Sequence, residues 1–169
     1  MLRRFQNRLT ESRIELETAV ALDRNDAHAW LNLGQTLMFL GRPTEGITAI
    51  DNAARLDGLS PNPGFGRWAL GVCHLLLGHV NEAADLLRKA RTENPRIYFF
   101  HLYLAGALGF DDDLDEAKTA LAAAIKLKPE VNSMARWRAY QPWITNPQQW
   151  ALREKTVNVG LRRAGFPNE

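Results

Sequence analysis

The chain has 169 residues, of which 46% are hydrophobic and 24% charged, and its formal net charge at pH 7 is only +2. These values are typical of a globular protein and exclude the disordered and collagen-like classes. No apolar run reaches the roughly 18 residues of a membrane-spanning helix, and the charged N-terminus lacks the apolar core of a secretion signal. The single cysteine, Cys73, excludes an internal disulfide and favours a reducing, cytoplasmic location.

Residues 9–23 predict a helix, and Asp26 is a suitable N-cap for the next one, which carries Trp30. This next helix has a glycine, Gly34, in its interior, where glycine costs roughly 1 kcal/mol relative to alanine. Pro43 follows Gly41 and marks the first turn of another helix. The interior glycine therefore needs an explanation in the way the helices pack.

The sequence repeats with a period of 34 residues. In the middle of the chain the recurring positions are Ala83 and Ala117, Leu87 and Leu121, Ala90 and Ala124, and Pro95 and Pro129. Nearer the N-terminus they are Leu16 and Ile50, Ala19 and Ala53, and Leu22 and Leu56. Ala53 and Ala90 are 37 apart, and a loop at 58–66 can absorb the three extra residues. A fixed period of this length is typical of a repeat protein.

The stretch Trp30-x2-Leu33-Gly34-x2-Leu37 resembles the opening of the tetratricopeptide repeat (TPR) signature, W-x2-L-G-x2-Y, which continues with A-x3-F and then P. Leu37 stands in place of the signature's Tyr. The later parts are matched by Ala83-x3-Leu87 with Pro95 and by Ala117-x3-Leu121 with Pro129. The resemblance implies an all-α solenoid of TPR helical hairpins, wound into a right-handed superhelix. It places repeats at 1–26 (partial), 27–60, 64–97 and 98–131.

The resemblance also explains the interior glycine. Small residues occupy the first helix of each repeat where the second helix crosses it, namely Gly34, Gly71 and Ala105. Small residues face them from the second helix, namely Gly46, Ala83 and Ala117. A larger side chain would push the two backbones apart. The glycine therefore marks a scaffold position.

The N-terminal repeat is incomplete. Residue 1 falls past the Trp and Leu-Gly places of its repeat, so residues 1–7 supply only the tail of a first helix. A second helix needs a partner to bury its apolar face. We therefore expect the chain to be a fragment of a longer protein. The alternative is that residues 1–26 form one extended helix completed by another chain.

Residues 132–169 are predicted to cap the solenoid. Asn146 and Pro147 open a helix whose apolar stripe is Trp150, Val157, Leu161 and Ala164, and Gly165 ends it. The tail from Trp150 onward resembles the end of TPR regions in bacterial adenylate/guanylate cyclase-type and winged-helix regulatory proteins. The basic residues are interpreted as solvated cations and not as a nucleic-acid surface: Arg136, Arg138, Lys155, Arg162 and Arg163.

No pattern indicates catalysis, a cofactor or a metal site. Cys73 and His74 are helix neighbours that point about 100° apart, so they cannot act as a nucleophile–base pair. The four histidines lack the spacing of metal ligands on one helix face. The acidic run 111–115 begins like a calcium loop, but Glu116 and Ala122 stand where that loop needs Gly and Glu.

In TPR proteins, the first helices line the concave side that receives a partner. Helical spacing places the partner-binding candidates there: Leu31, Gln35, Met38, Phe39, Phe65, Trp68, Val72, Leu76, Phe99, Tyr103 and Phe110. Family members that grip a terminal carboxylate use Lys, Arg and Asn at such places, whereas Leu31, Trp68 and Leu102 stand here, which argues against that clamp. The candidates instead form an apolar, aromatic groove.

We therefore expect a non-enzymatic protein-interaction module that binds an apolar peptide or helix of another protein in this groove. No cofactor, membrane or nucleic-acid partner is expected. Two alternatives remain open. The module self-associates through its incomplete N-terminal repeat or its groove, or some candidates close the repeat interfaces while the C-terminal segment fills part of the groove.

Overall fold

The computed structural model describes residues 8–57 and 63–169, which form ten helices and no strand. The helices are α2 (Leu9–Leu22), α3 (Ala27–Phe39), α4 (Pro43–Asp57), α5 (Pro63–Leu76), α6 (Val80–Glu93), α7 (Tyr98–Phe110), α8 (Leu114–Leu127), α9 (Met134–Ala139), α10 (Pro147–Lys155) and α11 (Val157–Arg163). The predicted all-α fold is confirmed. The expected helix tail in residues 1–7 lies outside the described residues.

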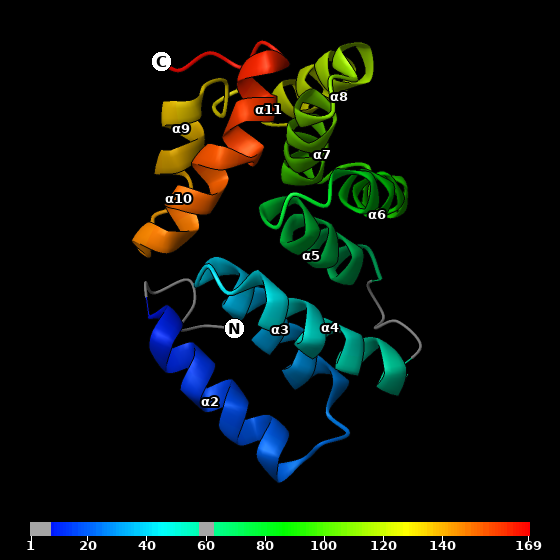
Figure 1. The fold of residues 1–169 in the computed structure, drawn as a ribbon, viewed down its shortest axis with the longest axis vertical. Helices are drawn as coiled ribbons and strands as arrows, with labels where there is room; N and C mark the ends of the chain where they lie inside the picture. Colours follow the sequence, from blue (N-terminus) through cyan, green and yellow to red (C-terminus); the bar gives the residue numbers. More distant parts are fainter. Residues whose placement is uncertain (1–7, 58–62) are drawn as a thin grey trace.

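Consecutive helices pair as the hairpins α3–α4, α5–α6 and α7–α8, which stack along the long axis of the molecule (Figure 1). The small residues mark the crossings, as predicted. A Cβ added at Gly34 would lie 2.4 Å from Ile50 Cγ1 and 2.9 Å from the carbonyl oxygen of Gly46. One added at Gly71 would lie 3.2 Å from the carbonyl oxygen of Ala83. Close approach of the paired helices therefore requires these residues to be small.

One loop prediction needs correction. The stretch 58–66 was expected to be a loop, but α5 already begins at Pro63, where a proline fits the first turn of a helix. Gly64 lies in the first turn of α5 close to the end of its partner helix α6, where an added Cβ would come within 2.1 Å of Asn94 Nδ2. Residues 58–62 are not described.

The helix caps follow the sequence. The side chains of Asp26 and Asn146 accept hydrogen bonds from the first turns of α3 and α10. Asp113 accepts one from the Glu116 N–H at 3.4 Å. The Glu116 carboxylate, however, does not complete a capping box, because it pairs with Arg88 of the neighbouring hairpin.

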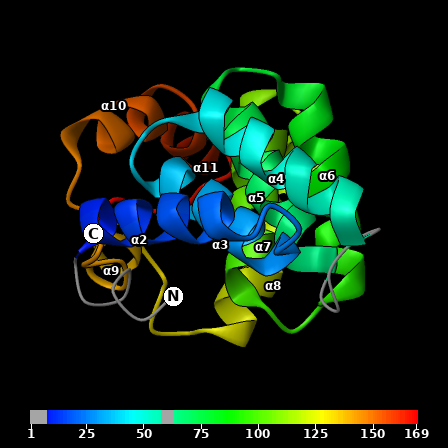
Figure 2. The ribbon, with the colours of Figure 1, turned by 90° about the horizontal axis from the view of Figure 1, so that it is seen from below.

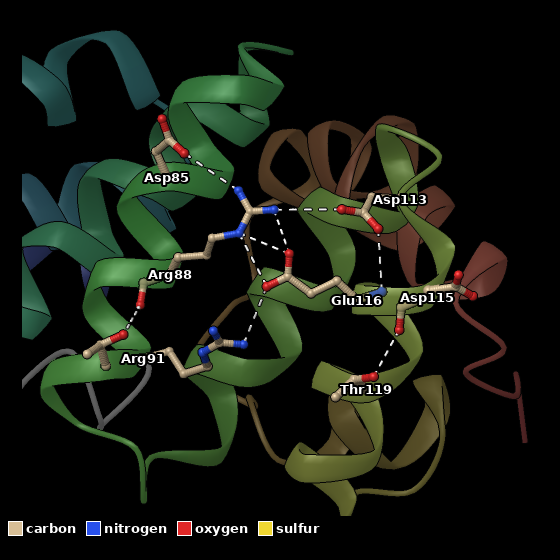
Figure 3. Close-up of polar contacts among 8 residues, drawn as sticks. Asp85, Arg88, Arg91, Asp113, Asp115, Glu116 and Thr119 are labelled. Atoms are coloured by element: carbon tan, nitrogen blue, oxygen red, sulfur yellow. Dashed lines mark hydrogen bonds and ion pairs between the residues drawn. The ribbon is translucent and has the colours of Figure 1, made fainter.

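This pairing joins the second helices of two hairpins at the surface (Figure 3). Arg88 Nη2 donates to Glu116 Oε2 at 2.6 Å and lies 3.7 Å from Asp113 Oδ2, while its Nη1 lies 3.5 Å from Asp85 Oδ1. Arg91 Nη1 approaches Glu116 from the same helix at 3.6 Å. The network fixes the spacing of α6 and α8 on the outer side of the stack.

The C-terminal segment differs from the expectation of one helix after Asn146. The helix breaks at Thr156, whose backbone has φ −131° and ψ −88°, and this break separates α10 from α11. The break allows α10 and α11 to pack on different surfaces of the molecule. Seen from below, α4 and α6 lie on one side of the stack and α10 lies on the other (Figure 2).

Helix α11 packs closely on α7 through glycines. A Cβ added at Gly160 would lie 1.8 Å from the carbonyl oxygen of Gly106, and one at Gly109 would lie 2.1 Å from the carbonyl oxygen of Gly160. Val157 and Leu161 are fully buried beside them. Helix α11 is therefore the capping element that covers the last repeat. Within the described ranges, no helix has the length and apolarity needed to cross a membrane.

Candidate protein-interaction groove

The predicted partner-binding residues all lie on the first helices α3, α5 and α7, but they differ in exposure. Seven are buried: Gln35, Met38, Phe39, Trp68, Val72, Leu76 and Tyr103. Four are half-buried: Leu31, Phe65, Phe99 and Phe110. The buried residues contact the rest of the chain instead of solvent, so an exposed groove along their whole length is not present in this structure.

Trp68 lies at the centre of an aromatic layer formed by Phe39, Phe65, Trp68, Phe99, Phe100 and Tyr103. The Trp68 ring centroid lies 5.1 Å from that of Phe99 and 5.8 Å from that of Tyr103, both in edge-on arrangements that aromatic rings prefer. Only 5% of Trp68 is exposed. The aromatic layer is therefore part of the core, and we call it the floor because it lies where the sequence predicts the floor of a groove.

One edge of this floor remains accessible. Phe65 and Phe99 lie in the first turns of α5 and α7, with ring centroids 6.2 Å apart. Leu31 lies on α3 near Gly66, where an added Cβ would be 3.9 Å from Leu31 Cδ1. All three side chains are half-buried. We call Leu31, Phe65 and Phe99 the open edge, because they are predicted partner-binding residues that keep part of their surface exposed.

The other part of the floor shares its core with the C-terminal segment. Trp137 of α9 is 1% exposed and its ring lies 5.4 Å from that of Tyr103. From α10, Gln149 and Arg153 are fully buried. Sequence reasoning missed these two polar residues. A signal was available, since Gln149, Arg153, Val157 and Leu161 recur every four residues and would share one helix face.

Arg153 is buried without a carboxylate partner in the described chain. Its Nη1 donates to Gln141 Oε1 at 2.5 Å, whereas its Nε and Nη2 have no hydrogen-bond acceptor. The guanidinium carbon lies 4.1 Å from the ring centroid of Trp137, 4.6 Å from that of Trp150 and 5.7 Å from that of Tyr103. Burial lowers the pKa of the Arg153 guanidinium, which nevertheless stays charged at neutral pH.

Other basic residues of the tail are exposed and paired. Arg162 Nη2 donates to Glu154 Oε2 at 2.8 Å, and Arg163 Nη1 to Asp112 Oδ1 at 3.2 Å. Arg138 lies over the ring of Trp150 at 4.5 Å. The Arg163 contact ties the end of α11 to the last repeat, whereas the other two lie within the C-terminal segment.

The residues considered for chemistry form no site. Burial raises the pKa of the Cys73 thiol to about 12, so it stays protonated. His74 lies beside His79, with their Nδ1 atoms 3.3 Å apart, while His101 Nε2 is 2.9 Å from the carbonyl oxygen of Pro95. No group of three or more candidate metal ligands occurs among the described residues.

A known protein family and several solved structures resemble this chain. The tetratricopeptide repeat profile matches residues 1–62 and 33–96. No curated protein sequence matches the chain. Among solved structures, MamA shares 20% identity with a TM-score of 0.65, covering 96% of this chain and 88% of its own. YrrB, described as a TPR protein with an unusual peptide-binding site, shares 18% with a TM-score of 0.60, covering 94% and 79%.

A partial match is the Thermobaculum terrenum O-GlcNAc transferase, with 23% identity and a TM-score of 0.57. It covers 63% of this chain but only 20% of the transferase. At these identities the structural matches show a shared helical-repeat fold.

Proposed function

Because the chain belongs to the tetratricopeptide repeat family, we propose that it is a non-enzymatic module that binds an apolar peptide or helix of another protein in its concave groove. The TPR fold is consistent with protein–protein interaction. The aromatic layer is the observation that carries the narrower proposal, since large rings dominate the binding energy of protein interfaces.

In this proposal α10 acts as a lid over the floor. The lid is connected to the fixed cap α11 by the break at Thr156, which can serve as a hinge. Its inner face carries buried polar atoms that lack partners in the described chain. Such atoms weaken the contact between lid and floor. A ligand enters at the open edge and lies between α10 and the aromatic layer.

YrrB supports this reading by analogy, because it is a TPR protein of similar fold with a peptide-binding site. The apolar character of the floor then favours a ligand segment with large apolar side chains. Phe39, Trp68, Phe99 and Tyr103 are its proposed anchors, of which Phe99 is accessible before the lid moves.

The experiment is selection of displayed random peptides against the full chain, followed by calorimetric measurement of one selected peptide. A Phe65→Ala/Phe99→Ala variant should bind at least about tenfold more weakly, because interface aromatics contribute on the order of 2 kcal/mol each. The matched control is Leu56→Ala/Leu127→Ala, which removes exposed apolar side chains from the second helices α4 and α8. Circular dichroism verifies folding of both.

Peptide affinity that survives in the open-edge variant and falls in the control would place binding elsewhere and contradict the proposal. Failure to select any peptide would contradict it as well.

Self-association is the second candidate function, and one observation favours it. Helix α2 exposes Leu22 (85%) and Ile14 (51%), two large apolar side chains on a second helix. A second copy of the chain can cover this face. Sedimentation should then show a dimer that Leu22→Glu dissociates. A monomer at all concentrations tested excludes this candidate.

We also infer a cytoplasmic setting in a bacterial regulatory protein. The support is the free thiol of Cys73 and the resemblance of the tail described above. Fractionation of the source cells with an antibody against the chain tests it, and recovery outside the cytoplasm would contradict it.

A further inference from the structure

Several buried hydrogen-bond donors at Arg153 and beside it lack an acceptor in the described chain. Arg153 of α10 contributes Nε and Nη2, and Trp137 of α9, whose ring lies against the guanidinium, contributes its indole Nε1. Arginine and tryptophan nitrogens can only donate. Tyr103 Oη and both amide atoms of Gln149 also lack partners. The unpartnered donors of Arg153 and Trp137 call for an acceptor beside the guanidinium, whereas Gln149 Oε1 and Asn158 Oδ1 are acceptors that lack a donor.

The positive charge of the buried Arg153 also calls for an acceptor, and in particular for an anion. A fully buried arginine is rare in proteins unless an anion pairs with it. The nearest carboxylate along the helix, Glu154, is already bonded to Arg162 at 2.8 Å and to Asn158 Nδ2 at 2.6 Å. Arg138 adds a further positive charge beside Trp150. The aromatic rings around Arg153 offer a cation–π contact but no acceptor in the plane of the guanidinium.

A pocket adjoins the indoles around Arg153, although Arg153 itself is not among its lining residues. A pocket of about 230 Å³ is bounded by Trp137 and Trp150, the two indoles that lie against the Arg153 guanidinium. Its remaining lining is Met134, Ala135, Arg138, Glu154, Asn158 and Arg162. The exposed cations at its rim attract an anion toward the opening.

We propose that the inner face of the lid is a carboxylate-binding site centred on Arg153, with Nε and Nη2 donating in parallel to the two carboxylate oxygens. A planar, bidentate pair is the geometry in which guanidinium and carboxylate bind best. The site differs from the terminal-carboxylate clamp of related proteins, because that clamp's places carry Leu31, Trp68 and Leu102 here. The carboxylate belongs to a free organic acid or to a bound peptide, and the peptide source rests on the proposed function.

The first arm of the test uses the free acid. The ¹⁵N-labelled full chain is titrated with sodium propionate, and the Nε–Hε resonance of Arg153 is followed by NMR. That resonance is assigned by its loss in Arg153→Met. We expect a saturating downfield shift that sodium chloride at equal ionic strength does not produce. The matched control Arg163→Met, which alters a surface arginine, should respond as the wild type does.

No shift with propionate, or an equal shift with chloride, overturns the proposal. The readout is made in the wild-type chain, so it does not depend on folding of the variant.

The second arm uses a groove-binding peptide with blocked termini, in one version with a single Glu and in another with Gln at that place. The Glu version should bind the wild type about tenfold more tightly, and Arg153→Met should abolish the difference. Equal binding of both versions, together with a propionate response, overturns the peptide source and supports the free acid. If neither peptide binds while propionate still does, the proposed function fails and the carboxylate site stands.

Discussion

The two helices after Asn146 are held against the repeats in opposite ways. Helix α11 meets α7 through Gly106, Gly109 and Gly160, where an added Cβ would come against the backbone of the other helix. Helix α10 reaches the aromatic layer with Arg153, whose guanidinium lies 5.7 Å from the ring centroid of Tyr103 and whose Nε and Nη2 remain unpartnered in the described chain. A close-packed apolar contact leaves no room for another group, whereas a buried polar contact with missing partners is incomplete.

The difference teaches that one short segment can make both a close-packed contact and an incomplete one. Helix α11 is the cap, which protects the last repeat as a solenoid needs. Helix α10 is the lid of the proposed function. Substitutions in the floor, in the cap α11 and in the lid α10 should therefore have different effects on stability.

The largest effect is expected for the floor. Trp68→Ala removes the central ring of the aromatic layer and should lower the free energy of unfolding by about 3–5 kcal/mol, through lost burial and the cavity left behind. Urea denaturation followed by circular dichroism measures this change. A loss below about 1 kcal/mol would show that the ring is not part of the core. Such a result would restore Trp68 as a purely partner-facing residue.

The cap should respond next most strongly. Gly160→Val forces α11 away from α7, because even a Cβ at this place would lie 1.8 Å from the carbonyl oxygen of Gly106. We expect a loss of about 3 kcal/mol from overpacking. Gly165→Ala lies just beyond the same helix in open space, although its positive φ makes the change mildly unfavourable, so it serves as the comparison. An unchanged melting midpoint for Gly160→Val would contradict the close contact.

A substitution in the lid α10 should change stability in the opposite direction. Arg153→Met replaces a buried, unpaired charge with an apolar side chain of similar length, so stability should stay constant or rise by about 1 kcal/mol. Thermal melting of this variant beside Arg163→Met measures the change. A loss of more than about 2 kcal/mol would mean that Arg153 has a compensating partner and that the polar contacts of the lid are complete.

The smallest effect belongs to the outer network. The hydrogen bond from Arg88, more than the nearby positive charge, lowers the pKa of Glu116 below its usual 4.5. A lowered carboxyl pKa stabilises the fold above pH 4.5, and this contribution is lost as the pH falls through the folded-state pKa. Glu116→Gln should therefore cost less than about 1 kcal/mol at neutral pH, because the pair is partly exposed and screened.

The same variant should make stability less dependent on pH in the acidic range. Denaturation curves recorded on both sides of pH 4.5 check this. Parallel curves for wild type and Glu116→Gln would contradict the coupling to Arg88.

Much of the fold could be predicted because it depends on local rules. The period of 34, the small residues at Gly34 and Gly71, and the caps at Asp26 and Asn146 each follow from one sequence feature with one structural cause. The break at Thr156 could not be predicted in this way. It arises because the segments on its two sides dock on different surfaces, which no helical pattern specifies.

The site was predicted less completely for a related reason. The spacing of Trp68 and Tyr103 identifies the face of a helix, but it does not say what covers that face. Arg153, which lies over the ring of Tyr103, comes from 50 positions further along the chain, so the contact is a property of the tertiary structure. Gln149 and Arg153 carried a periodic signal, yet polar residues on an apolar stripe are usually assigned to solvent.

Hydrogen exchange on the ligand-free full chain tests the central claim most directly, because it compares the amides of α10 (Pro147–Lys155) with those of α11 (Val157–Arg163) in one molecule. If α10 is a movable lid, its amides exchange through local opening. They should then exchange at least about tenfold faster than those of α11, after correction for intrinsic rates. Equal protection along both helices would mean that they open only together, and the concave groove would then have no lid.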